Sequence, residues 1–399
     1  MLLHGRLREY RDLFRLGPVL LAWTVGHGAM WFLMPNIVGA IVGDVVLVGV
    51  IISLPAVVAM LVDLPIGDLT DRMGSRRLLL SGLFALGVLG ASLSYVSNLL
   101  GLLAFMVFLG LLYQLVYIPA KAYVMDVSPL GKSSEYLGFE MSFIMLGLAL
   151  GPIAAGMIIS KGLSPNLAGS LLYVFSCFSA LTLGVLLFRD CMPHECFTKA
   201  IREVLVEDKV FLKELVEYAR LKSTGLSILV LTFTFTFYDG MVWTIQPLHY
   251  LSFTDSALEG GLILSSFVLP FILFDIPGGR LADRFGRRKI LMFGLALGGV
   301  SSIAFSMAST VPQLMLSAFI ATSGLAFAWP SMEGILTVKT DLGGRGSVIG
   351  VWSTARDLGY VLGPICGGLL AKALGLDRVF MVLGVLLLAV MAFTFKIRE

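Results

Sequence analysis

The sequence predicts an all-α membrane protein with twelve transmembrane helices in two six-helix bundles related by pseudo-twofold symmetry. Of its 399 residues, 57% are hydrophobic and only 14% are charged. The mean hydropathy is +0.92, and long apolar runs separate the charged clusters. Shifting residues 20–161 by 212 positions also aligns five segments with the second half. Such a duplicated set of membrane helices, with a site between the repeats, is typical of transporters.

Twelve apolar runs are long enough to cross a bilayer, which takes about 20 residues of helix. In the first half they are Leu16–Val38, Leu47–Ile66, Leu78–Val96, Leu99–Met125, Leu137–Ile159 and Leu167–Phe188. In the second half they are Leu226–Leu248, Gly260–Pro277, Ile290–Ala308, Val311–Val338, Val348–Ala371 and Val379–Phe395. A chain in lipid must satisfy its backbone within helices or a closed barrel, and these runs are too long for barrel strands.

The repeat defines the domain organisation. The aligned residues are Trp31 with Trp243, Pro35 with Pro247, Asp63 with Asp275, Asp71-Arg72 with Asp283-Arg284 and Gly151-Pro152 with Gly363-Pro364. We therefore expect an N-terminal bundle over 1–188 and a C-terminal bundle over 226–399. The polar interval 189–225 would be a cytoplasmic linker, whose apolar residues recur at the spacing of an amphipathic helix.

The distribution of Lys and Arg predicts the orientation. With both termini inside, cytoplasmic segments hold 24 of the 29 Lys and Arg, whereas the outside loops hold only Lys161, Lys372 and Arg378. Basic residues in short loops stay on the cytoplasmic side. We therefore predict a multi-pass protein of the plasma membrane with both termini in the cytoplasm. This asymmetry and the anionic inner leaflet account for the net charge of +3 without a nucleic-acid partner.

Several other classes of protein are disfavoured. A nucleotide-driven pump needs a phosphate loop, but Gly-Lys-Ser at 131–133 lacks the Gly five residues earlier. No HExxH or GxSxG pattern indicates an enzyme. Cys191, His194 and Cys196 are three potential zinc ligands in one short loop without a fourth. We expect no enzyme activity, no metal site and no cofactor.

The most specific motif lies between the second and third runs of each half. It runs from Gly67 through Leu69, Asp71-Arg72 and Gly74 to Arg76-Arg77 in the first half. In the second half it comprises Gly279, Leu281, Asp283-Arg284, Gly286 and Arg287-Arg288. Gly permits close helix approach and a tight turn, Asp can meet a helix N-terminus, and Arg is a multidentate donor. The chain resembles the major facilitator superfamily, whose twelve-helix members carry this loop in both halves.

The resemblance implies a cytoplasmic latch between the bundles. Asp71 would face the start of the eleventh helix near Ser347, and Arg72 would pair with Asp126 at the end of the fourth. In the second copy the position matching Asp126 is Val338. We therefore expect an asymmetric latch in which the first-half side matters more.

A second signature lies on the fifth helix of each half. Its residues are Gly138, Gly147, Gly151-Pro152, Ala155 and Gly156 in the first half, and Gly350, Gly359, Gly363-Pro364 and Gly367-Gly368 in the second. Small residues three or four apart allow close helix packing, and Pro bends the span. In the superfamily that the chain resembles, the fifth-helix copy of this pattern accompanies antiporters that export drugs or metabolites. The Arg that proton-coupled antiporters often carry on the fourth helix is missing from Phe105 to Gln114.

Ionisable residues within the spans are the candidate site residues, because charges in lipid usually face a cavity. His27 and Trp31 on the first helix correspond to Asp239 and Trp243 on the seventh, where Gln246 lies on the same face. Tyr117 and Lys121 on the fourth correspond to Trp329 and Glu333 on the tenth, and Lys121 could pair with Glu333. Arg356 and Asp357 lie about 100° apart on the eleventh. We expect Glu140 to be an interfacial residue.

These residues predict proton-coupled export of small amphipathic or drug-like compounds by alternating access. The proton-coupling residues would be Asp239, Glu333 and Asp357, with Asp239 leading. The substrate cavity would be lined by His27, Trp31, Tyr117, Lys121, Trp243, Gln246, Trp329 and Arg356. The partners would be a small-molecule substrate, protons and the bilayer, and the protein would be a monomer. Uptake or facilitated diffusion of a nutrient or anionic metabolite stays open, as does a non-transporting receptor.

Overall fold

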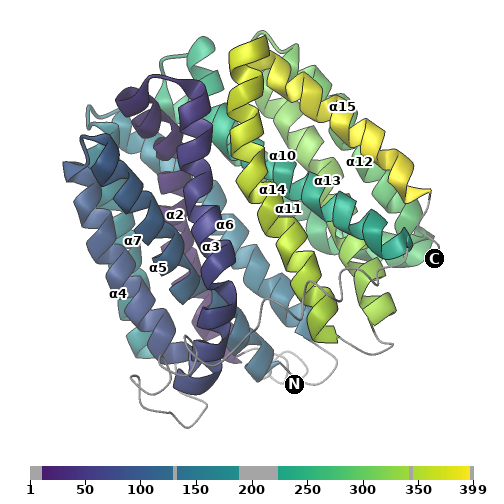
Figure 1. Cartoon of the computed structure of the whole chain (residues 1–399), viewed down its shortest axis with the longest axis horizontal. Coiled ribbons are helices and arrows are strands. Elements are labelled where there is room, and N and C mark those ends of the chain that lie inside the picture. Colours follow the sequence, from purple (N-terminus) through teal and green to yellow (C-terminus); the bar gives the residue numbers. More distant parts are fainter. Residues whose placement is uncertain (1–10, 129–132, 188–222, 341–344, 396–399) are drawn as a thin grey trace, which may run out of the picture. The chain divides into compact units, whose positions relative to one another are not determined.

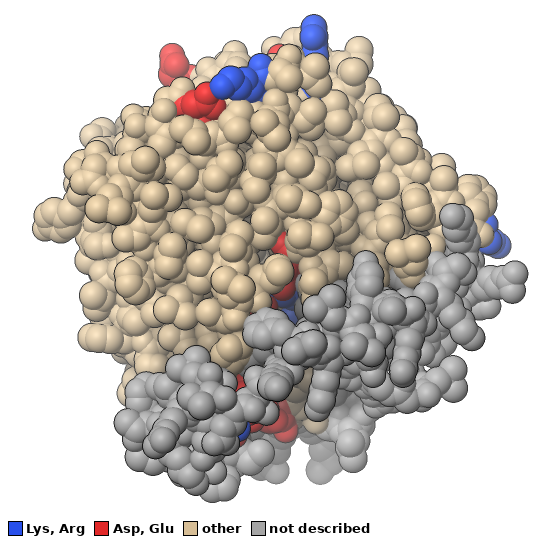
Figure 2. Space-filling model, viewed as in Figure 1, with Lys and Arg blue, Asp and Glu red and all other residues tan. Residues whose placement is uncertain are grey.

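The computed structural model describes residues 11–128, 133–187, 223–340 and 345–395, and within these ranges the regular elements are all helices. Twelve helices in the described ranges are long and apolar enough to cross a membrane (Figure 1). Charged side chains are sparse over the middle of the described surface (Figure 2), as expected for helices in lipid. The prediction of an all-α protein with twelve membrane spans is confirmed.

The helices follow the order of the predicted spans. In the first half they are α2 (Arg11–Val42), α3 (Val45–Met73), α4 (Ser75–Ser92), α5 (Leu99–Val127), α6 (Ser133–Ile159) and α7 (Pro165–Leu187). In the second half they are α10 (Ser223–His249), α11 (Ala257–Phe285), α12 (Arg287–Ser306), α13 (Val311–Thr340), α14 (Arg345–Leu374) and α15 (Leu376–Thr394). Short 3₁₀ turns, η1 (Leu93–Tyr95) and η2 (Tyr250–Ser252), follow α4 and α10.

The predicted loops between the second and third spans are mostly helix. Helix α3 continues to Met73 and α11 to Phe285, beyond the apolar runs, because hydropathy marks only the part of a helix suited to lipid. The chain turns at one residue in each half, Gly74 with φ 86° and Gly286 with φ 98°. These two glycines are equivalent in the repeat, and each directly precedes the next helix.

We expect Gly74→Ala and Gly286→Ala each to destabilise the protein by about 1 kcal/mol or more, because a side chain disfavours positive φ. Gly67→Ala is the matched control, since a methyl group there would meet nothing within 4 Å and the residue lies within α3. Thermal unfolding in detergent measures all three variants. Equal melting temperatures for Gly67→Ala and Gly74→Ala would show that the turn does not require glycine.

The chain divides into two compact units. Unit 1 comprises Met1–Leu33 and Val57–Asp208, and unit 2 comprises Met34–Ala56 and Lys209–Glu399. The end of α2 and the start of α3 thus group with the second-half helices. The predicted domains at 1–188 and 226–399 stay a prediction, and most of the 189–225 linker lies outside the described residues.

Polar contacts hold the Met34–Ala56 segment within unit 2. The Lys372 ammonium lies 2.5 Å from Asp44 Oδ2, and Asp44 Oδ1 accepts the backbone N–H of Val46 at 2.8 Å. The Asn36 amide donates to the Pro247 carbonyl at 2.9 Å. Close backbone packing supplements these bonds, because Gly49 lies against the Pro364 carbonyl and Gly368 against residues 45–46. The segment therefore binds to both α10 and α14.

The Asp44–Lys372 pair should make a small contribution to stability that depends on pH. The hydrogen bond from Lys372 lowers the pKa of Asp44, with the Val46 N–H acting in the same direction. A lowered folded pKa means that the contribution is present above the ordinary carboxyl pKa and is lost as the pH falls through the folded value. We therefore expect the contribution to be present near neutral pH. It should be larger at low salt, because the lysine side chain is exposed and salt screens the pair.

A double-mutant cycle with Asp44→Asn and Lys372→Met measures this contribution by thermal unfolding at neutral and acid pH. Coupling between the substitutions at neutral pH that disappears in acid is the expected result. Strictly additive melting temperatures at neutral pH and low salt would contradict it.

The same helix crossing occurs in each unit. In unit 1, Gly147 of α6 lies against Leu21 and Thr24 of α2. In unit 2, Gly359 of α14 lies against Phe233 and Thr236 of α10. Each pair of contacting residues is repeated 212 positions later. The small residues of the predicted packing motif therefore lie where the backbone of α6 approaches α2, and where that of α14 approaches α10.

Candidate functional site

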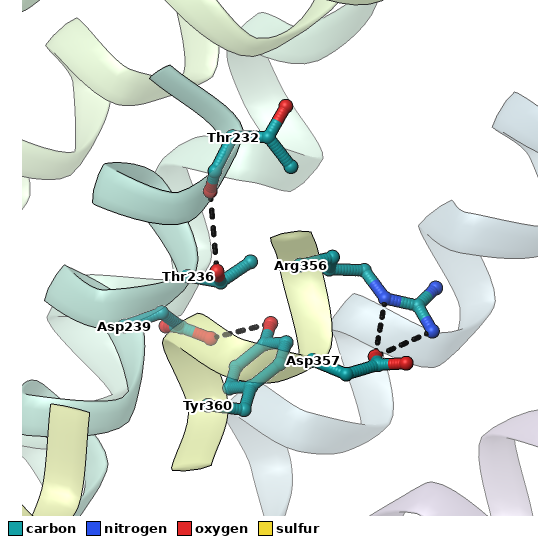
Figure 3. Close-up of polar contacts among 6 residues, drawn as sticks. All are labelled: Thr232, Thr236, Asp239, Arg356, Asp357 and Tyr360. Atoms are coloured by element: carbon teal, nitrogen blue, oxygen red, sulfur yellow. Dashed lines mark hydrogen bonds and ion pairs between the residues drawn. The ribbon is translucent and has the colours of Figure 1, made fainter. Parts of the chain in front are cut away.

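The Asp239 carboxylate lies in unit 2, between α10 and α14, and accepts two hydrogen bonds from neutral donors. The Trp243 indole N–H donates to Oδ1 at 3.1 Å, from one turn further along α10. The Tyr360 hydroxyl donates to Oδ2 at 3.0 Å, from α14 (Figure 3). Each carboxylate oxygen thus has a donor without a full positive charge. These two hydrogen bonds therefore do not neutralise the charge of the carboxylate.

Close packing of α10 and α14 brings Tyr360 to Asp239. The Thr236 hydroxyl turns back to donate to the Thr232 carbonyl at 3.1 Å (Figure 3) and lies against Gly359, the residue before Tyr360. A methyl group at Gly240, next to Asp239, would lie 3.6 Å from the Tyr360 Cα. Small residues on both helices therefore set the separation at which the tyrosine hydroxyl reaches the carboxylate.

Arg356 and Asp357 form an ion pair on α14, one turn before Tyr360. The Arg356 Nε and Nη2 atoms lie 3.0 Å and 2.9 Å from Asp357 Oδ1 (Figure 3). Their side chains are 17% and 12% exposed, so the pair is largely shielded by protein. Although the two Cβ positions are separated around the helix, the long arginine side chain bends back to its neighbour. Unit 2 thus contains the hydrogen-bonded Asp239 carboxylate on α10 and, on α14, an ion pair one turn from Tyr360, the residue that donates to Asp239.

Unit 1 repeats the indole contact with an imidazole in place of the carboxylate. The Trp31 N–H donates to His27 Nε2 at 2.6 Å, which is the same i, i+4 arrangement as Trp243 and Asp239. Because Nε2 accepts this bond, His27 is neutral in this arrangement and carries its proton on Nδ1. The ring stacks on Tyr113 at a centroid separation of 4.6 Å. Sequence reasoning did not find Tyr113.

Of the other predicted cavity residues, Tyr117 and Lys121 extend the stack on His27, whereas Trp329 and Gln246 make separate contacts in unit 2. The Lys121 ammonium lies 4.8 Å from the centroid of the Tyr117 ring, which stacks on Tyr113 at 5.5 Å. Trp329 contacts Phe235 edge-on at 5.6 Å. Gln246 is fully buried and donates to the Gly260 carbonyl at 3.4 Å, so it links α10 to α11. The Glu333 side chain lies outside the described residues, and the Lys121–Glu333 pair stays a prediction.

Sequence reasoning missed Tyr360 and did not foresee the burial of Glu140. Tyr360 had no signal in the repeat, because its equivalent is Leu148. Glu140, expected at the membrane interface, is only 2% exposed, because α6 packs against α2 and buries it. Burial within the protein does not fix the depth of Glu140 in the membrane, so its interfacial position stays a prediction.

Two arginines of the predicted latch each pair with the carboxylate four residues earlier, Arg72 within α3 and Arg287 across the turn at Gly286. Arg72 Nη2 lies 3.1 Å from Asp68 Oδ2, and Arg287 Nη2 lies 3.0 Å from Asp283 Oδ1. The pKa of Asp71 is raised by partial burial and by the nearby charges of Asp68 and Asp126. The side chains of Val338 and Ser347 lie outside the described residues. The predicted contacts of Asp71 with the eleventh helix and of Arg72 with Asp126 stay predictions.

No group of three or more His, Cys, Asp or Glu in the described part of the chain could hold a metal ion. The cysteines and histidine of the 191–196 segment lie outside that part.

Twelve candidate membrane spans within the described residues, with ionisable side chains on several of them, are typical of a multi-pass membrane transporter. A model of the Major Facilitator Superfamily matches residues 19–225 and 228–399, and the chain belongs to this superfamily.

The comparisons with individual proteins cover most of the chain. "Multidrug resistance protein MdtG" of Escherichia coli O9:H4 (strain HS) is 26% identical over 323 residues, which are 79% of this chain and 76% of that protein. A crystal structure of a POT family transporter in complex with 5-aminolevulinic acid has a TM-score of 0.73 at 18% identity, covering 98% of this chain and 97% of that one. A crystal structure of a mutant of the nucleoside transporter NupG has a TM-score of 0.74 at 12% identity, covering 97% and 100%. The likeness to these solved structures shows the fold.

Proposed function

We propose that this transporter exports small amphipathic or drug-like cations in exchange for protons, by alternating access across the plasma membrane with both termini in the cytoplasm. The observation that carries the proposal is the Asp239 carboxylate, which accepts bonds from Trp243 and Tyr360. Two neutral donors orient the carboxylate but do not neutralise it. Its charge is left for a proton or a cationic substrate.

If a proton and a cationic substrate compete for the Asp239 carboxylate, the transporter exchanges one for the other. A proton on Asp239 removes the negative charge that attracts a cation, and a bound cation disfavours the proton. If each occupant crosses in its own half of the cycle, a proton gradient drives the substrate the other way. The Trp243 indole beside the carboxylate adds an aromatic face, which suits an aromatic or quaternary cation.

The relatives support export without identifying a substrate. The name of the MdtG relative describes multidrug resistance, at 26% identity. The POT family transporter was solved with 5-aminolevulinic acid, and NupG is a nucleoside transporter, so the same fold also handles small polar solutes.

The alternative is uptake or facilitated diffusion of an anionic metabolite. Lys121 and Arg356 favour it, because both are cations on membrane helices. Arg356, however, already binds Asp357, and Lys121 lies over the Tyr117 ring. The carboxylate at Asp239 therefore makes cation export the stronger proposal.

Purified protein in liposomes can test the direction of coupling. With ethidium as the fluorescent aromatic cation, vesicles that are acid inside should accumulate the dye as protons leave, and a protonophore should abolish the accumulation. This sign holds for both orientations of the protein in the membrane. Accumulation only in vesicles that are acid outside would indicate symport and overturn the proposal. Equilibration unaffected by the gradient would indicate a facilitator and overturn it too.

A further inference from the structure

Unit 1 contains a buried carboxylate that the exchange mechanism does not use. Glu140 of α6 is 2% exposed, and its Oε1 is buried without a hydrogen-bond partner. An ionised carboxylate out of water is costly unless charges or donors compensate it fully. The exposed fraction of Glu140 is lower than that of Asp357, which is 9%. Such a group requires a structural or functional reason.

The packing of α6 on α2 explains the burial. Glu140, Gly147 and Gly151 are spaced by seven and eleven residues, which places them on one face of the helix. Gly147 contacts residues 21–24 of α2 and Gly151 contacts residues 25–29, so the two helices run in the same direction. Glu140 is therefore level with the first described turns of α2.

Aromatic contacts fix the same level independently. Phe139 packs edge-on against Phe14 at a centroid distance of 5.1 Å, and Phe143 lies against Gly17. Glu140 lies between these two contacts in the sequence. Glu140 is therefore buried at the level where α6 packs on the first described turns of α2.

The described cation that acts on Glu140 is Lys121 of α5. The Lys121 ammonium also lies 4.8 Å from the Tyr117 ring centroid, so it has a second electron-rich neighbour on its own helix. Arg15, which has interactions of its own, is the charged residue with a described side chain in these first turns of α2. In its described length, α7 carries only Tyr173 and Cys177 as titratable side chains, and both are buried. Lys121 is therefore one counter-charge for the carboxylate, and its ammonium also contacts the Tyr117 ring.

We propose that Glu140 is a second proton-carrying carboxylate of the transport cycle, with Lys121 as its exchangeable counter-charge. The proposal rests on the proton coupling inferred above and adds a site in unit 1 to Asp239 in unit 2. The carboxylate takes one proton from water on one side and becomes a neutral acid, while Lys121 keeps its charge and stays over Tyr117. The proton then returns to water on the other side, and no bond of the substrate is made or broken.

Infrared difference spectroscopy of the protein in lipid tests the proton on Glu140 without any substrate. During a pH titration, the stretching band of protonated carboxyl groups should lose one component in Glu140→Gln and a different one in Asp239→Asn. Lys121→Met should move the pH at which the Glu140 component appears, and Lys121→Arg should restore it. A band that is identical in the wild type and Glu140→Gln would overturn the proposal, because a purely structural carboxylate would stay ionised.

Transport measurements separate this proposal from the proposed function. Glu140→Gln should retain ethidium counterflow without a gradient but lose accumulation in vesicles that are acid inside, with an unchanged melting temperature showing that it folds. Full accumulation by Glu140→Gln, with loss only in Asp239→Asn, would overturn the role of Glu140 and leave the proposed function intact. Failure of the wild type to move ethidium, with the Glu140 band present, would overturn the proposed substrate class and support the proton on Glu140.

Discussion

Replacing Asp239 with Asn should abolish gradient-driven accumulation of ethidium while preserving the folded state of the protein. Asn has nearly the same shape and keeps an oxygen that can accept the Trp243 bond, but it cannot take or release a proton. It also removes the negative charge that we propose for cation binding. Accumulation in vesicles that are acid inside should therefore fall to the level of protein-free vesicles.

Tyr360→Phe is the matched control for this experiment. It breaks the 3.0 Å bond to Asp239 Oδ2 but leaves the carboxylate and its bond to Trp243. Gradient-driven accumulation should survive in Tyr360→Phe, with a changed pH dependence. If Asp239→Asn accumulated ethidium as fast as the wild type, Asp239 would not be the proton carrier.

The fold was predictable because a bilayer imposes strong rules on a chain. Only long apolar helices satisfy the backbone in lipid, so hydropathy located all twelve spans. The ends of the helices were less predictable. Helices α3 and α11 continue through the charged motif to Gly74 and Gly286, because helical hydrogen bonding does not stop where the apolar run stops.

Contacts within one helix were predictable, and contacts between helices were not. The i, i+4 relation placed Trp31 by His27 and Trp243 by Asp239, and the structure has both hydrogen bonds. Tyr360 reaches Asp239 from another helix, at a position where the repeat has Leu148. No sequence spacing within α10 indicates that bond.

In the latch motif, the sequence predicted contacts between helices, whereas the structure has contacts between residues close in the sequence. As a loop, its charged residues would be available for the neighbouring bundle. In the last turns of α3, Asp68 and Arg72 are one turn apart and pair with each other. In the second half, Arg287 at the start of α12 pairs with Asp283 at the end of α11, across the turn at Gly286. Local geometry thus accounts for contacts that the resemblance alone would not supply.

A methyl group at Gly151 should strongly destabilise unit 1. The added carbon would overlap the Val25 carbonyl and the Ala29 amide, and it would lie 2.8 Å from the Gly28 carbonyl carbon. All three are backbone atoms of α2, so no side-chain rotation relieves the overlap. Overpacking costs roughly 1–3 kcal/mol, and we expect Gly151→Ala at the upper end of that range by thermal unfolding in detergent.

Gly138→Ala is the internal control, because it lies on the same helix and its added methyl group would meet nothing within 4 Å. Helix propensity alone would stabilise either variant by up to about 1 kcal/mol, so opposite signs at the two positions isolate the effect of packing. Gly363→Ala makes the equivalent change in unit 2, where the nearest atom is the Phe237 carbonyl oxygen at 2.6 Å. Because close packing of α14 on α10 also brings Tyr360 to Asp239, Gly363→Ala should impair gradient-driven transport as well as stability. Equal melting temperatures for Gly138→Ala and Gly151→Ala would show that the helices can separate without cost.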